Sequence, residues 1–271
     1  MAFPFENYVV ARCTACTGEF LEPQPSDETL ASIYTADYFF KNETDDERLR
    51  HQTLKRETAK KTLDALFAAN GPVAGKLLEI GGGTGDFLVE AEHRGFEVTG
   101  IEFSETSAAA TAARIRGAVI VGTLESANLD DASHDIIANS DVIEHVRDPL
   151  AFVREMRRVL RPGGFALVST PSLDSWSRRL MGSRWVEYKI EHLFYLNARS
   201  IKALFREAGF QNVTILPNVK SLSIDYIAGH FEKFPIPVWS GLVKTVRRAV
   251  PPLVAHRPIN IVASGMTVIA S

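Results

Sequence analysis

From Lys76 onward, apolar runs of about five residues alternate with longer amphipathic stretches. The apolar runs predict strands at 76–80, 96–101, 119–121, 135–139 and 164–170. The amphipathic stretches predict helices at 86–94, 105–116 and 149–160. The last helix ends at "LRPGG" (160–164), because proline and paired glycines do not continue a helix. This alternation predicts an α/β fold, a doubly wound, mostly parallel sheet with helices on both faces.

The flanking segments complete this picture. Residues 47–70 are typical of a charged amphipathic helix, and residues 1–46, rich in proline, are expected to be an irregular N-terminal cap. A helix over 198–208, a strand over 210–216 and a last strand in "NIVASGMTVIA" follow the core. The two added strands bring the sheet to seven.

Residues 218–258 form a long, proline-punctuated insertion in which apolar and basic residues mix. Such segments are usually lids or contact surfaces. We therefore predict four units: a cap (1–46), a core (47–217), an insertion (218–258) and a final core strand (259–271). The insertion suits either peripheral contact with a membrane surface or a homodimer contact.

Composition narrows the choice of partners. The chain has 271 residues, 45% of them hydrophobic, and a net charge of −3 with scattered basic residues, so nucleic acid is not expected as a partner. The chain contains no run of 18 apolar residues and no recognisable secretion signal, so we expect no transmembrane segment and a cytoplasmic location.

The only cysteines are Cys13 and Cys16, in "CTAC". They can be half of a zinc site, a redox couple or a remnant of one. A structural zinc site needs four ligands, and no βαβ pattern follows the pair. We favour a reduced pair in an N-terminal hairpin.

The segment "LLEIGGGTGDF" (77–87) places glycines at 81, 83 and 85, where a turn can pass close to a ligand. Dinucleotide sites require G-x-G-x-x-G, and here Asp86 or Leu88 stands where the third glycine is needed. No Lys-Ser or Lys-Thr follows, which excludes a P-loop. A tight turn without a ligand is the structural alternative.

The next strand ends in "IEFS". Its Glu102 lies at the carboxyl end of the strand, where a carboxylate can accept both hydroxyls of a ribose. Phe103 can lie flat on a purine or pack into the core. Together these features indicate a nucleoside site.

The segments "EIGGGTG", "IEFS", "SDVIEHVRDP" and "RVLRPGGFALVSTPS" together resemble the class I S-adenosylmethionine-dependent methyltransferases, in the branch with ubiquinone-type and sugar O-methyltransferases. The resemblance covers residues 47–217 and implies a Rossmann-like methyltransferase fold with S-adenosylmethionine as cofactor. It implies a set of cofactor-binding residues: Glu79, Gly81, Gly83, Gly85, Glu102, Phe103, Thr123, Leu124 and Asp141. Family members often carry an Asp near Thr123, and a backbone contact to the adenine is the substitute here.

The branch also often carries a CxxC, a P-x-P and then a Y-x-x-x-Y. These motifs are matched here by Cys13 and Cys16, Pro23 and Pro25, and Tyr34 and Tyr38. Relatives with a fuller zinc ribbon have a further cysteine pair, which this chain lacks. The tyrosines can close over the cofactor carboxylate and the substrate, or simply staple the cap to the core. We expect Tyr38 to bind cofactor and Tyr34 to bind substrate.

Two histidines are candidates for the base that an alcohol acceptor requires. His145 and Asp141 follow the fourth strand and are expected to face the methyl group, although His145 can equally pack a loop. His192 lies in a segment rich in aromatic residues and can be the base or a helix-capping contact. This segment predicts an aromatic-walled acceptor pocket, with substrate contacts from Trp185, Tyr188 and Tyr195.

We therefore expect a methyltransferase acting on a small molecule, with O-methylation of a sugar-containing or other secondary metabolite favoured and His192 preferred as base. An N- or C-methyltransferase and an inactive cofactor-binding scaffold are the alternatives. We expect no metal site, since no acidic cluster accompanies the histidines in the sequence.

Overall fold

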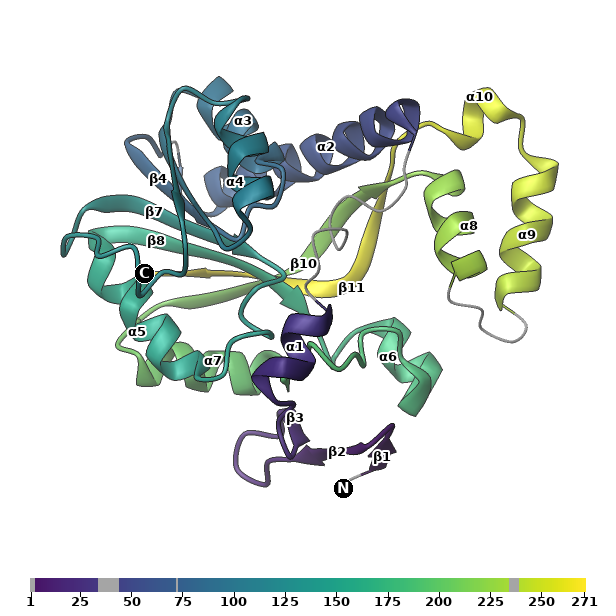
Figure 1. The fold of residues 1–271 in the computed structure, drawn as a ribbon, viewed down its shortest axis with the longest axis horizontal. Helices are drawn as coiled ribbons and strands as arrows, with labels where there is room; N and C mark the ends of the chain where they lie inside the picture. The colour runs from purple at the N-terminus through teal and green to yellow at the C-terminus, as the bar shows by residue number, and fades with distance from the viewer. Residues whose placement is uncertain (1–2, 34–43, 72, 234–238) are drawn as a thin grey trace.

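The computed structural model describes residues 3–33, 44–71, 73–233 and 239–271 (Figure 1). Its main sheet has seven strands in the order β10-β11-β8-β7-β4-β5-β6. Their bounds are β4 Lys76–Ile80, β5 Glu97–Glu102, β6 Ala118–Val121, β7 His134–Ser140, β8 Leu160–Pro171, β10 Val213–Leu222 and β11 Ile259–Ala270. Strands β6, β5, β4, β7 and β8 pair in parallel, while β11 and β10 are antiparallel. The predicted mostly parallel seven-stranded α/β fold is confirmed.

Helices cover both faces of this sheet (Figure 1). One core cluster packs the sheet against two of them, α5 (Pro149–Val159) and α7 (Ala198–Glu207). A second cluster packs the other face against α2 (Asp45–Asn70) and α3 (Asp86–His93). Helix α4 (Glu105–Ala112) lies beside β5 and β6 and ends earlier than the predicted Arg116.

Local signals explain where these helices begin. Thr44 caps α2 in a capping box with Glu47, in which each residue's side chain bonds the other's backbone amide. Asp148 caps α5, and Pro149 occupies its first turn, where the missing amide hydrogen is not needed. Helix α5 ends at Val159, immediately before the "LRPGG" that was predicted to stop it.

The expectation of an irregular N-terminal segment is wrong for residues 3–22. Strands β1 (Phe3–Phe5), β2 (Tyr8–Arg12) and β3 (Glu19–Glu22) form an antiparallel sheet, which β9 (Phe194–Tyr195) joins as fourth strand. Cys13 and Cys16 are free thiols in the turn between β2 and β3, as the predicted hairpin requires. The short strands and their polar turn hid this sheet from the sequence pattern. Helix α1 (Asp27–Ile33) follows it.

The insertion extends away from the sheet as helices (Figure 1). Helices α8 (Ile224–Lys233), α9 (Trp239–Ala249) and α10 (Pro252–Ala255) lie between β10 and β11, and β10 runs to Leu222 instead of ending at Leu216. The short α6 (Trp176–Met181) and the 3-10 turn η1 (Gly182–Arg184) follow β8. Among the helices of the described ranges, none is both long and apolar enough to cross a membrane.

Candidate active site

The glycine loop joins β4 to α3 at the carboxyl edge of the sheet. Gly81, Gly83 and Gly85 all have positive φ, of 71°, 59° and 73°. A Cβ at Gly81 would meet Val142 and one at Gly85 would meet Thr111, both at 2.6 Å, whereas a Cβ at Gly83 would meet nothing within 4 Å. Gly81 and Gly85 therefore serve packing within the protein, and Gly83 leaves an open space beside the loop.

Side chains from the neighbouring elements hold this loop. The Oε2 atom of Glu102 accepts a hydrogen bond from the Gly83 amide at 2.8 Å, and the Thr111 hydroxyl donates to the Gly83 carbonyl at 3.0 Å. Arg114 donates to Asp86 at 2.7 Å and to the Thr84 carbonyl. The loop is thus fixed from β5 and α4 without its open side being covered.

Glu79 lies inside β4 and is buried beneath the loop. A Cβ at Gly82 would lie 2.3 Å from its Oε2 atom, so only glycine fits above this carboxylate. Oε2 has no hydrogen-bond partner within the described ranges. Burial, reinforced by the charges of Asp86 and Glu102, raises the pKa of Glu79 to about 8. The backbone amide of Leu88 and the charge of Lys55 oppose this shift without cancelling it, so the carboxyl is only partly compensated.

A second group of polar side chains lies at the carboxyl ends of β7 and β8. The rings of His145 and His192 meet edge to face, with centroids 4.7 Å apart. Each Nδ1 atom faces a backbone carbonyl, His145 that of Glu191 at 2.9 Å and His192 that of Glu187 at 2.8 Å. Burial lowers the pKa of both rings, and that of His192 strongly, so both are neutral near pH 7.

Asp141 stands at the start of the same turn, in a left-handed conformation with φ of 54°. Its Oδ2 atom accepts from the Lys220 ammonium of β10 at 3.1 Å, and the charge of Asp141 raises the pKa of Lys220. Nearby, Glu144 is 1% exposed and accepts from the Thr170 hydroxyl at 3.0 Å. The sequence did not show Lys220, Glu144 or Thr170, because they come from three different segments.

A methyltransferase-domain family matches residues 49–215 of the chain. The chain belongs to the class I S-adenosylmethionine-dependent methyltransferases. A relative from Mycolicibacterium smegmatis, named "Probable S-adenosylmethionine-dependent methyltransferase", is 31% identical over 194 residues, which cover 70% of this chain and 65% of that protein. A ubiquinone biosynthesis O-methyltransferase of Caulobacter vibrioides is 38% identical over 122 residues, 42% of this chain and 48% of that protein. The chain thus spans less than two thirds of the length of these relatives.

Solved structures show the same fold. A methyltransferase of Thermotoga maritima, titled a possible histamine N-methyltransferase, aligns with a TM-score of 0.55 at 22% identity, covering 83% of this chain and 94% of that one. Phosphoethanolamine N-methyltransferase 2 of Haemonchus contortus, solved with S-adenosylmethionine, aligns with a TM-score of 0.58 at 17% identity, covering 93% and 61%.

The carboxyl edge of this methyltransferase fits its cofactor, S-adenosylmethionine. The acidic side chains at this edge suit a ligand that carries an ammonium, a sulfonium and ribose hydroxyls. Among them is Glu79, whose Oε2 atom lies buried beneath Gly82 and has no hydrogen-bond partner among the described residues. Phe103 is 73% exposed at the end of β5, so the core-packing alternative is wrong and its ring is open to a ligand. Thr123 is exposed, whereas Leu124 is buried in the core, so the side chain of Leu124 does not face a ligand.

The predicted aromatic acceptor pocket is wrong for Trp185, Tyr188 and Tyr195, whose exposures are 2%, 6% and 2%. They form a small core with β2 and β3. The sequence pattern gave no sign of this N-terminal sheet, so the burial of these side chains was not expected. The Tyr188 hydroxyl donates to Glu19 at 2.5 Å. Tyr34 and Tyr38 lie outside the described residues, so their predicted contacts stay predictions.

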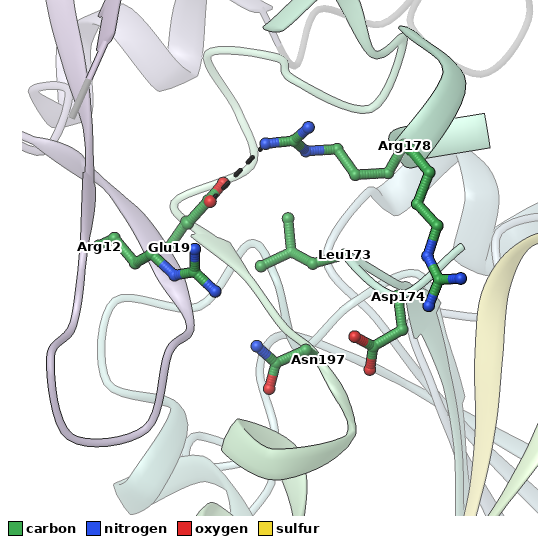
Figure 2. A pocket seen from close by; sticks show the side chains of 7 residues that line it. Arg12, Glu19, Leu173, Asp174, Arg178 and Asn197 are labelled. Atoms are coloured by element: carbon green, nitrogen blue, oxygen red, sulfur yellow. Dashed lines mark ion pairs between the residues drawn. The ribbon is translucent and has the colours of Figure 1, made fainter. Parts of the chain in front are cut away.

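A pocket of about 200 Å³ lies instead between the N-terminal sheet and α6 (Figure 2). Its lining is mostly charged and comprises Arg12, Glu19, Leu173, Asp174, Arg178, Arg179 and Asn197. Arg178 and Glu19 form an ion pair across it at 3.8 Å. The hollow next to the aromatic cluster is therefore polar.

Proposed function

We propose that this methyltransferase acts on a small molecule and methylates a hydroxyl oxygen of a sugar-containing or other secondary metabolite. The observation that supports this best is the neutral histidine pair at the carboxyl ends of β7 and β8. A neutral alcohol must lose its proton as its oxygen gains a methyl group, and a neutral imidazole can accept that proton.

The residues divide the work as follows. When bound, S-adenosylmethionine supplies a methyl group on a positively charged sulfur. Glu79 and Asp141 offer negative charge to it, and Glu102 offers its carboxylate to the ribose hydroxyls. The aligned acceptor and the exclusion of water provide much of the acceleration for such a transfer.

We assign the proton to His145 rather than to the His192 preferred from the sequence. His192 is 4% exposed, whereas His145 is only partly buried in the same cluster. Because the Nδ1 atom of each ring faces a carbonyl, the proton would arrive at Nε2. His192 then positions the His145 ring through their edge-to-face contact.

The relatives favour oxygen over nitrogen. The ubiquinone-type relatives carry an O-methyltransferase name at 38% and 27% identity, whereas the N-methyltransferase neighbours share the fold alone.

We retain the insertion as a proposed lid or contact surface, since α9 exposes Trp239, Leu242 and Val246.

A screen with labelled S-adenosylmethionine tests the proposal. Matched acceptors that differ only in carrying a hydroxyl or an amine are incubated with the enzyme. The proposal expects label in the hydroxyl series, and label in the amine series alone would overturn it.

A further inference from the structure

Glu144, His145 and His192 lie together in one cluster, in which Glu144 and His192 are buried and His145 is partly buried. One carboxylate oxygen and one ring nitrogen from each histidine all lie within 4.8 Å of one another. Two separate segments supply them, and backbone bonds join these segments, since the amides of Leu193 and Phe194 both donate to the Glu144 carbonyl at 2.8 and 3.2 Å. The cluster is therefore held by the main chain.

The protonation of the two rings follows from their partners. A carbonyl oxygen only accepts, so each Nδ1 atom carries the hydrogen that it donates to Glu191 or Glu187. In a neutral imidazole the other nitrogen, Nε2, then carries a lone pair. A backbone carbonyl on the far nitrogen is also the usual way in which proteins orient a metal-binding histidine.

Glu144 adds an acceptor that lacks a donor. Its Oε2 atom accepts from Thr170, but Oε1 is buried without a hydrogen-bond partner in the part of the chain that the structure covers. Because Glu144 is only 1% exposed, an oxygen without a donor lowers the stability of the fold unless another group compensates for its lost hydration. This oxygen, with a ring nitrogen from each histidine within 4.8 Å, therefore points to a cation.

We propose that Glu144, His145 and His192 form a binding site for a divalent transition-metal ion of the zinc type. Two imidazole nitrogens and one carboxylate oxygen are a common set for such ions, and three protein ligands leave a coordination position open. Metal–ligand bonds of about 2.0–2.2 Å place ligand atoms about 3–4 Å apart, so small side-chain shifts complete the site. The proposal departs from the expectation of no metal, because only the fold brings His192 to Glu144.

The open position suits an oxygen ligand, water or the acceptor hydroxyl, whose proton a bound cation makes easier to remove. The same Nε2 lone pairs hold either a proton or the ion, so in the metal-bound enzyme the acceptor proton passes to water instead of to His145. This role rests on the proposed function, whereas the binding of the ion does not.

The test is metal binding by the purified full-length protein after treatment with a chelator. Zn²⁺ affinity is measured by competition with a chromophoric chelator, and Co²⁺ is titrated for the visible absorption of a low-coordinate site. Besides the wild type, the variants are Glu144→Gln, His192→Ala and the more conservative His192→Gln. The double variant Cys13→Ser/Cys16→Ser is the control, since the cysteine pair is the competing zinc site.

We expect one ion per chain. The affinity for this ion should be unchanged in the cysteine variant and at least ~10-fold weaker in folded Glu144→Gln and His192→Gln. An absence of binding at micromolar Zn²⁺ and Co²⁺, or binding lost only with the cysteines, would overturn the proposal and show that the cluster shares a proton only. Ion binding by an enzyme that methylates nitrogen would leave this inference standing and overturn the proposed function.

Discussion

The carboxylate of Glu102 accepts a hydrogen bond from the backbone amide of Gly83 at 2.8 Å. This bond ties the end of β5 to the glycine loop, so the side chain that we propose for the ribose hydroxyls also shapes the loop. The structure of the proposed cofactor site therefore depends on a contact between two motifs that are separate in the sequence.

Glu102→Ala should weaken S-adenosylmethionine binding by about 1–3 kcal/mol, because the ribose hydroxyls and the Gly83 amide lose their acceptor. Calorimetric titration measures this loss. Glu105→Ala is the matched control, since Glu105 is exposed on the following helix and should leave the affinity unchanged. Equal losses in both variants would show that the effect is general electrostatics.

Alanine substitutions at Gly83 and Gly85 should differ in their effects on stability and on cofactor affinity. Gly83→Ala pays about 1–2 kcal/mol for a left-handed alanine, and its new methyl group enters the open space, so it should fold and bind cofactor poorly. Gly85→Ala adds a 2.6 Å contact with Thr111, which itself holds the loop, and should lose more unfolding free energy. Denaturant titration and calorimetry measure the two effects. Normal cofactor binding by Gly83→Ala would contradict the placement.

Cofactor affinity should depend on pH through Glu79. Burial and the charges of Asp86 and Glu102 raise its pKa to about 8, while Lys55 opposes this shift. A cationic ligand favours the ionised carboxylate, so affinity should rise with pH up to about 8, by at most ~10-fold per unit. Glu79→Gln should bind weakly with a flatter profile, and an unchanged pH profile would contradict this role.

The same shift has a consequence for stability in the absence of cofactor. Between the ordinary pKa near 4.5 and about 8, the folded state retains a proton that the unfolded state releases, so stability should fall as pH rises through this window. Burial also raises the pKa of Glu144 to about 8, which lowers stability with rising pH in the same way. Denaturation of wild type and Glu79→Gln at pH 5 and 8 measures the difference.

The histidines should differ in their effects on turnover. His145→Ala should lower kcat by ~10²- to 10⁴-fold with cofactor affinity nearly unchanged, as expected for a lost base. His192→Ala should lower kcat less, and His192→Gln should restore part of it if the residue only positions His145. A larger loss in the His192 variants would return the base to His192.

The sequence was sufficient for the α/β sheet because each core strand is a short apolar run between amphipathic helices. Strand β4 matches its predicted bounds, and the glycine loop and Glu102 lie where the resemblance placed them. The small N-terminal sheet was missed since its strands are short and one of them, β9, comes from the far end of the core. Pairing between distant segments leaves no local pattern.

The acceptor side was predicted less well for the same reason. The density of aromatic residues near Trp185 indicated a pocket, but that cluster is the core under the N-terminal sheet. His145 and His192 were each identified as candidates, yet their contact, and the approach of Glu144 and Lys220, depend on the fold. Residue type predicted the chemistry, and tertiary structure decided which residues share it.

The identity of the methylated atom tests the central claim most directly. The enzyme is given S-adenosylmethionine with a ¹³C-labelled methyl group and an acceptor that carries both a hydroxyl and an amine, and the product is examined by NMR, beside the His145→Ala variant. The account predicts a methyl carbon bonded to oxygen, formed by the wild type and at least ~10²-fold more slowly by the variant. A methyl carbon bonded to nitrogen or carbon, or equal rates of oxygen methylation in both proteins, would contradict it.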